Sequence, residues 1–134
     1  GNVPTVDKDM APKIFRALHQ AIKQGLILSC HDLSEGGLAV AAAEMAFAGG
    51  VGVEIEISAG NLAAALFSES NSRFLVEVAP LHTSRMESVF RNLQHFRVGT
   101  TTHQPLMTAS IDGSNVVSAS LTELKAHWQI PLSM

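Results

Sequence analysis

Apolar residues recur along the chain with two different periods, and the changes between these periods predict the order of helices and strands. Near the N-terminus the apolar side chains of Ile14, Leu18 and Ile22 lie four positions apart, as on the buried face of a helix. In VGVEIEI, residues 51–57, valine and isoleucine occupy every second position, as in a strand with one buried face. The same reasoning predicts helices at 10–24, 36–48, 61–67, 83–94 and 121–130, and strands at 26–30, 51–57, 73–79, 96–102, 106–112 and 115–119.

Residues with cap and turn chemistry mark the ends of these segments. Asp9 can cap the first helix, and Gly25 is expected to end it. Near the start of the helix 83–94, Ser84 is followed three residues later by Glu87, which is the spacing of a capping box. The other predicted boundary residues are Asn61, Gly113 in a hairpin turn, and Ser120 or Thr122 at the last helix.

The order of the segments predicts the fold class. Helices and strands alternate at first, and a hairpin and a helix close the chain. This order is typical of a layered α/β/α domain with a mixed sheet, which some schemes class as α+β. We expect residues 1–134 to form a single domain, with residues 1–8 as a linker. A dinucleotide-binding fold is not indicated, because no G-x-G-x-x-G follows the first strand.

Composition narrows the classes of partner. Apolar residues make up 46% of the chain and charged residues only 16%, so either another domain or subunit covers part of the surface or the core is large. The net charge is −3 and the sequence has no run of basic residues, so it does not indicate binding to nucleic acid or to an anionic membrane. The sequence has no apolar run of bilayer length and no signal-peptide pattern. The single cysteine, Cys30, excludes an internal disulfide, so we expect a cytoplasmic protein.

The segment HDLSEGG carries the strongest candidate chemistry. It links a strand to an alanine-rich helix, which Ser34 or Asp32 is placed to cap. Gly36 and Gly37 leave the unpaired N–H groups of the first turn open to a ligand, at the positive end of the helix dipole. This pattern is typical of a phosphate site, although Glu35 would repel a phosphate unless it points away or a Mg²⁺ lies between them. The alternative is that Ser34 only caps the helix and that the glycines permit tight helix–sheet packing.

The adjacent residues His31 and Asp32 are a weaker candidate. They could form an acid/base pair or a metal pair, but neighbouring residues at a strand end point to different sides. A histidine held by local hydrogen bonds is the commoner case. The histidines of the chain show no metal-binding spacing. Phe15 and Trp128 are most simply explained as core residues.

A second polar cluster, FSESNSR, lies in the predicted connection between the helix 61–67 and the next strand. Its residues Glu69, Ser70 and Arg73 offer donors and acceptors to a ligand. A plain solvated turn explains the same residues equally well. The hydroxyls of VGTTT, residues 98–102, are better explained as the end of a strand.

Taken together, HDLSEGGLAVAAAEMAFAGG, LFSESNSRFLVEV and VGTTT resemble the C-terminal domain of the aminoimidazole ribonucleotide synthetase superfamily. The resemblance covers roughly residues 3–130. The pattern H-D-x-S-[DE]-G-G-L followed by A-E-M-A-F-A-G is specific, whereas thiamine-monophosphate kinases and selenophosphate synthetases share only a shorter D-x-S-x-G core. LFSES favours the phosphoribosylformylglycinamidine synthase family within the superfamily. Glu35 stands where many relatives have aspartate, so the charge is kept.

The resemblance implies a fold of partial ferredoxin-like topology and a role in purine biosynthesis. It implies the C-terminal domain of an ATP-dependent ligase that converts formylglycinamide ribonucleotide and glutamine-derived ammonia to formylglycinamidine ribonucleotide. ATP would activate the formyl-amide oxygen, and ammonia would displace it. The implied contacts to the substrate's ribose phosphate are Asp32, Ser34, Gly36 and Gly37 with His31 nearby, and Glu69, Ser70 and Arg73 as further cleft contacts.

The resemblance also implies partners for this domain. An N-terminal domain supplies most ligands of ATP and Mg²⁺ and the catalytic histidine, so this chain by itself holds no catalytic or metal-binding residue and is expected to be inactive alone. The alanine-rich helix or a sheet face is expected to pack against that domain. A glutaminase and a small accessory subunit are further implied partners. The alternatives are another superfamily member, acting as a cyclo-ligase or small-molecule kinase, and a non-catalytic docking domain.

Overall fold

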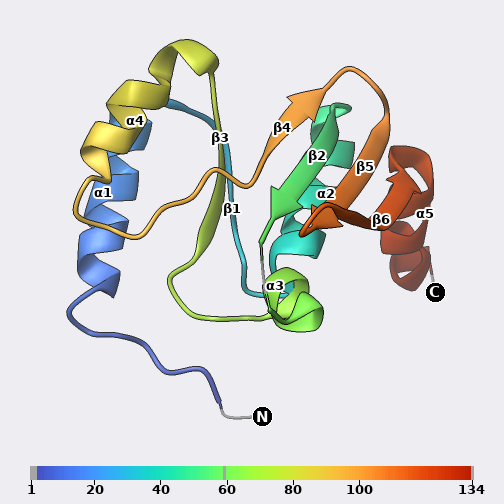
Figure 1. Ribbon diagram of the computed structural model, residues 1–134, viewed down its shortest axis with the longest axis horizontal. Coiled ribbons are helices and arrows are strands. Elements are labelled where there is room, and N and C mark those ends of the chain that lie inside the picture. Colours follow the sequence, from blue (N-terminus) through green and yellow to red (C-terminus); the bar gives the residue numbers. More distant parts are fainter. Residues whose placement is uncertain (1–2, 59, 134) are drawn as a thin grey trace.

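The computed structural model describes residues 3–58 and 60–133, and its helices and strands follow the predicted order (Figure 1). The helices are α1 Ala11–Lys23, α2 Gly37–Gly49, α3 Leu62–Phe67, α4 Thr83–Val89 and α5 Leu121–Gln129. The strands are β1 Ile27–Asp32, β2 Gly52–Ile57, β3 Phe74–Val78, β4 Gly99–Thr102, β5 Leu106–Ile111 and β6 Ser114–Ser120. Two short 3₁₀ segments, η1 Pro80–His82 and η2 Ile130–Ser133, precede α4 and follow α5.

The strands form two sheets. Four of them make a mixed sheet in the order β4-β2-β5-β6, in which β2 is parallel to β5 and antiparallel to β4, and β6 is antiparallel to β5. The predicted mixed sheet is therefore confirmed. β1 and β3 pair with each other as a separate antiparallel ribbon, which the sequence pattern did not predict. In Figure 1 α1 and α4 lie beside each other on one side of this ribbon, and the larger sheet with α2 and α5 lies on the other.

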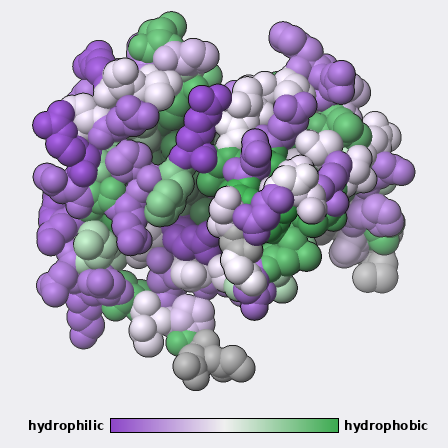
Figure 2. All heavy atoms as spheres, in the orientation of Figure 1, coloured by the Kyte–Doolittle hydropathy of each residue, from purple (hydrophilic) through white to green (hydrophobic). Residues whose placement is uncertain are grey.

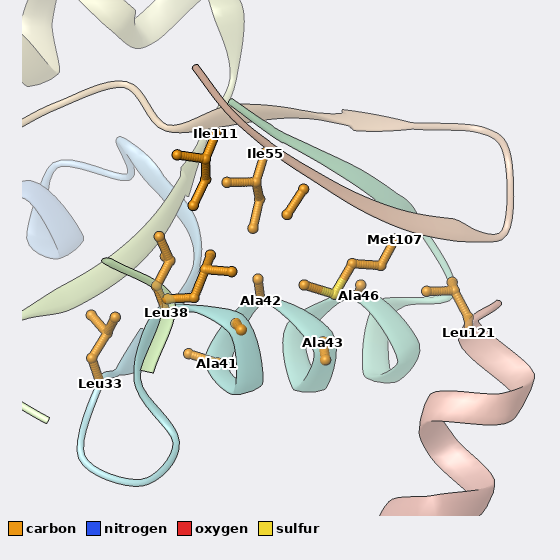
Figure 3. Close-up of a cluster of buried hydrophobic side chains, with 13 residues drawn as sticks. Leu33, Leu38, Ala41, Ala42, Ala43, Ala46, Ile55, Met107, Ile111 and Leu121 are labelled. Carbon is orange, nitrogen blue, oxygen red and sulfur yellow. The ribbon is translucent and has the colours of Figure 1, made fainter. Parts of the chain in front are cut away.

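The larger hydrophobic cluster lies between α2 and the four-stranded sheet. Figure 3 shows Ile55, Ile111 and Met107 pointing from the strands toward Ala42 and Ala46 on the helix. Small side chains allow a helix to approach a sheet closely. Of the two surfaces expected to pack against another domain, the alanine-rich helix is therefore excluded, because most of its alanines are covered within this chain. Packing through a sheet face stays a prediction. The buried alanines of α2 are Ala39, Ala41, Ala42, Ala43 and Ala46.

A smaller hydrophobic cluster joins α1 to α4. Its buried members are Ala17, Ala21, Leu26 and Phe90. α1 ends as predicted at Gly25, which has a φ of +66°. The Gly25 N–H donates to the Ile22 carbonyl, and the Leu26 N–H donates to the Ala21 carbonyl, which makes a Schellman motif and leads directly into β1.

The predicted start of α1 is wrong in detail. Asp9 does not cap it; the helix begins after Met10, whose side chain makes no cap bond. The Asp7 carboxylate instead accepts hydrogen bonds from the N–H groups of Asp9 and Met10, at 2.9 and 2.8 Å. The preceding turn is therefore fixed by an aspartate two residues earlier than predicted.

The predicted N-terminal caps are confirmed at α3 and α5 and are wrong at α4. Asn61 caps α3 by accepting from the Ala64 N–H, and Ser120 forms a capping box with Glu123 at α5. At α4 the predicted Ser84–Glu87 box is absent, since η1 already turns the chain before Thr83. The same helix ends at Val89, five residues earlier than predicted, and residues 90–98 lead to β4 without regular structure.

Two aromatic residues that we expected in the core lie at the surface. Phe15 is 49% exposed and Trp128 is 47% exposed. Each ring packs on one other ring, Phe15 edge-on to Phe74 and Trp128 tilted on Phe47. Figure 2 shows that hydrophobic surface on this face lies in separate areas among hydrophilic side chains. No helix in residues 3–58 and 60–133 has the length and apolarity that crossing a bilayer requires.

Candidate functional site

The antiparallel ribbon brings the two polar clusters of the sequence together. Asp32, the last residue of β1, is paired with Phe74, the first residue of β3. The Leu33 N–H also donates to the Arg73 carbonyl at 3.1 Å. The turn after β1 and the loop before β3 therefore lie side by side, although they are separated by some forty residues of chain.

A cleft of about 700 Å³ lies between this turn and this loop. Of the predicted site residues, His31, Asp32, Ser34, Glu69, Ser70 and Arg73 line it. Gly36 and Gly37 lie at the adjacent start of α2 and are not part of the lining. Two more lining residues, Asn71 and Ser72, belong to the polar cluster FSESNSR noted in the sequence. The lining residues that the sequence did not indicate are Phe15, Cys30, Leu33 and Phe74.

Arg73 organises the loop that forms one wall of the cleft. Its Nη1 donates to the Ser68 carbonyl at 3.2 Å, to the Ser68 hydroxyl at 2.8 Å and to the Ser70 hydroxyl at 3.4 Å. Ser72 in the same loop has a φ of +63°, which an L-residue rarely adopts. The loop is thus shaped by its own contacts rather than being a plain solvated turn. Within residues 3–58 and 60–133 the Arg73 guanidinium bonds to Ser68 and Ser70 but to no carboxylate, so its charge is available to an anion in the cleft.

The start of α2 differs from the predicted cap. Neither Ser34 nor Asp32 caps the helix: Gly36 is the cap residue, in the left-handed region with a φ of +71°. Its N–H donates to the Glu69 carboxylate at 2.9 Å. The Ser34 hydroxyl donates instead to the Asp32 carboxylate. A carboxylate from the opposite loop therefore already bonds to one of the N–H groups that we predicted to face a phosphate, so the phosphate site at these glycines stays a prediction.

Gly37 is required by close packing as well as by its backbone. It is buried and has a φ of +64°. A Cβ at this position would lie 2.8 Å from the Leu66 carbonyl oxygen and 2.9 Å from Phe67 Cα. The packing alternative considered for the glycines therefore holds for Gly37, with the end of α3 rather than a sheet as its neighbour.

His31 is held by acceptors at both ring nitrogens. Nδ1 lies 2.6 Å from the Asp32 carbonyl oxygen, and Nε2 lies 2.8 Å from Oε2 of Glu44, in the middle of α2. The bond to the Asp32 carbonyl, followed by the Glu44 carboxylate, raises the pKa of His31 above its ordinary value and outweighs the opposite effect of burial. Sequence reasoning gave no signal for Glu44, which lies 13 residues away on another element.

Two other cleft groups have shifted pKa values. The Ser34 hydroxyl, the Asp32 backbone N–H and the His31 ring lower the pKa of Asp32, which therefore stays ionised at neutral pH. Burial, with a smaller contribution from the Asp32 carboxylate, raises the pKa of the Cys30 thiol, so this thiol is a poor nucleophile at neutral pH.

The cleft combines groups that can recognise a polar, anionic ligand. It offers the Arg73 guanidinium, the His31 ring and several hydroxyls, while Phe15 and Phe74 supply an apolar wall. Across residues 3–58 and 60–133 no three His, Cys, Asp or Glu side chains are grouped so that they could hold a metal ion. The cleft can therefore bind and orient a ligand.

Comparison with known proteins gives consistent matches along the chain. The family described as AIR synthase related protein, C-terminal domain, matches residues 1–112. The chain is 36% identical over 132 residues to phosphoribosylformylglycinamidine synthase subunit PurL of Alkaliphilus metalliredigens, and 37% identical over 136 residues to the same subunit of Deinococcus radiodurans. These alignments cover 96% and 98% of the chain but only 18% of each relative, so the chain spans less than a fifth of their length.

Solved structures show the same fold. Thermotoga maritima PurL complexed with FGAR superposes with a TM-score of 0.82 at 20% identity, over 91% of this chain and 22% of that one. The Thermotoga maritima PurLQS structure gives a TM-score of 0.82 at 20% identity, over 92% of this chain and 23% of that one. PurL of the same organism complexed with ATP superposes with a TM-score of 0.77 at 21% identity, over 84% of this chain and 21% of that one.

Proposed function

Because the chain belongs to the family of AIR synthase related proteins, C-terminal domain, we propose that it is the C-terminal domain of a phosphoribosylformylglycinamidine synthase. The synthase would convert formylglycinamide ribonucleotide to its amidine with ATP and ammonia. Identity of 36–37% along nearly the whole chain to relatives of that name supports the assignment. On this proposal residues 1–134 are one domain of a longer polypeptide, residues 1–8 link it to an N-terminal domain, and the chain by itself is inactive.

The cleft between the β1–α2 turn and the loop before β3 is the observation that carries the proposal. Its lining has the Arg73 guanidinium on one side and the His31 ring on the other, together with the hydroxyl of Ser34. At the start of α2 the Gly36 N–H already donates to a carboxylate oxygen of Glu69. We assign the ribose phosphate of the substrate to this end of the cleft, where Asp32 orients the Ser34 hydroxyl. The relative crystallised with FGAR has the same fold, which supports this substrate class.

The remaining ligands belong to parts of the polypeptide beyond this fold. On this proposal ATP and Mg²⁺ would be held mainly by the N-terminal domain. Ammonia would come from a glutaminase, with a small accessory subunit as a third component. The existence of a PurLQS structure for a relative of the same fold supports an assembly with other subunits.

The test is a steady-state assay of the full-length polypeptide with Ser34→Ala. The single Ser34 proton is donated to Asp32 in the free domain, and on this proposal it turns to the phosphate when the substrate binds. This exchange of partners is worth about 0.5–1.5 kcal/mol, so we expect the KM for formylglycinamide ribonucleotide to rise about twofold to tenfold. Ser118→Ala, at an exposed position on β6, is the matched control and should leave KM unchanged. Gly37 is unsuitable for this test, since any side chain there disturbs α3. An unchanged KM in Ser34→Ala would remove the phosphate assignment.

A further inference from the structure

A chain of three side chains connects the cleft to the C-terminal helix. His31 lines the cleft, Glu44 lies in the middle of α2, and Trp128 lies near the end of α5. Oε2 of Glu44 lies 2.8 Å from His31 Nε2, and Oε1 of Glu44 accepts from Trp128 Nε1 at 2.9 Å. Both oxygens of one carboxylate are therefore used, one on each side of α2.

The geometry fixes the orientation of Glu44. An indole N–H can only donate, so it holds one carboxylate oxygen in place. The Trp128 ring also packs on Phe47, with centroids 5.7 Å apart, and Phe47 lies three residues after Glu44 on the same helix. The side chain of Glu44 is 27% exposed, so these bonds are made partly out of water.

The partners of His31 require protons on both of its ring nitrogens. The Asp32 carbonyl at Nδ1 and the Glu44 carboxylate at Nε2 are both acceptors. A neutral imidazole donates through only one nitrogen, whereas an imidazolium donates through both. With Glu44 as a carboxylate, the two bonds therefore exist together only if the ring is cationic.

We propose that Glu44 and Trp128, neither of which lines the cleft, are positioning residues that hold His31 as a doubly protonated cation at the edge of the cleft. The charged groups facing this ring are Glu44 from α2 and Asp32 from the end of β1, while Glu69 and Arg73 lie in the loop across the cleft. The indole from α5 is neutral. The raised pKa of His31 agrees with this arrangement.

The charge on His31 decides the electrostatics of the cleft. Without it the lining has two carboxylates, Asp32 and Glu69, against one guanidinium, Arg73, and it repels an anion. With a charged His31 the lining has two positive and two negative groups, and the second positive charge lies across the cleft from Arg73. This consequence rests on the proposed function, because it concerns the phosphate of the substrate.

The first experiment measures the charge of His31 directly. In the protein labelled with ¹³C-histidine, an NMR titration follows His31, whose signal is assigned by its loss in His31→Gln. We expect a titration midpoint above the ordinary value of 6.5, moved to lower pH in Glu44→Gln and in Trp128→Phe. A glutamine offers one carbonyl oxygen to two donors, and a phenylalanine keeps a ring against Phe47 but lacks the N–H.

The matched control is His127→Gln, an exposed ionisable residue next to Trp128 on the same helix. It should leave the midpoint of His31 in place. Trp128→Phe changes a half-exposed ring, so the test survives if Glu44→Gln does not fold. An unmoved midpoint in Trp128→Phe, a His31 ring that is neutral at pH 6 in the parent, or an equal shift in His127→Gln would overturn the proposal.

The second experiment separates this proposal from the proposed function. In the full-length polypeptide at pH 7.5, Trp128→Phe should raise the KM for formylglycinamide ribonucleotide about threefold to tenfold, as expected for loss of a nearby, partly exposed charge. The effect should shrink as the pH is lowered, because the ring gains its second proton in both proteins. A moved NMR midpoint with an unchanged KM refutes the phosphate assignment but not the role of Glu44 and Trp128. A raised KM with an unmoved midpoint refutes that role.

Discussion

Replacing Gly37 by alanine tests the close approach of α2 to α3. The new Cβ would lie 2.8 Å from the Leu66 carbonyl oxygen and 2.9 Å from Phe67 Cα, and both are backbone atoms that cannot turn away. An L-residue in the left-handed region costs about 1–2 kcal/mol, and overpacking adds about 1–3 kcal/mol. We therefore expect the free energy of unfolding to fall by about 2–5 kcal/mol, measured by urea denaturation with the slope held as a check on two-state behaviour.

Gly50 provides a matched control at the other end of the same helix. It has the same φ of +64°, but a Cβ there meets nothing within 4 Å. Gly50→Ala should cost only the backbone part, about 1–2 kcal/mol. The difference between the two variants then measures the contact with α3 alone. Equal losses in the two variants would show that Gly37 serves only its backbone conformation and would refute the packing explanation.

Three further predictions concern separate parts of the chain. Ser120→Ala removes the capping box of α5 and should lower the free energy of unfolding by about 1 kcal/mol, whereas Thr122→Ala should not; equal midpoints in urea would contradict this. Leu66→Ala opens a cavity at a side chain that is 1% exposed and should cost about 2–5 kcal/mol in the same assay. Because the pKa of His31 is raised by folding, its stabilisation is complete below the unfolded value of 6.5 and disappears as pH rises through the folded value. The parent should therefore lose stability over that range relative to His31→Gln, and parallel pH profiles would contradict the prediction.

The order of elements could be predicted because its signals are local. The period of the apolar residues, Asn61 and Ser120 as caps, and the Asp112–Gly113 turn all act within a few residues. Both turn residues have positive φ, +49° and +79°, which is the geometry of a two-residue hairpin turn. The end of α4 was missed because its apolar pattern continues through Phe90 and Leu93, which are used in the smaller cluster without being helical.

The site could be predicted only in parts. The sequence indicates the polar clusters HDLSEGG and FSESNSR separately. They lie side by side only because β1 pairs with β3, which is a non-local contact. The same holds for Glu69, which reaches Gly36 across 33 positions, and for Trp128, which reaches Glu44 across 84. A tryptophan with one polar atom bonded at the surface has the same sequence signature as a buried one. The residues of the candidate site were therefore predictable by type, but their partners were not.

The strand β1 connects the smaller hydrophobic cluster to the larger one, and the cleft is lined by residues from both sides of this connection. Ile27 packs on the smaller cluster, and Leu33, just after the strand, belongs to the larger one. Phe15, which lines the cleft, comes from α1, and α1 also contributes Ala21 to the smaller cluster. The two walls of the cleft therefore belong to separately packed parts of the chain. A side chain larger than alanine at the fully buried Ala21 would displace α1, and with it Phe15 in one wall of the cleft.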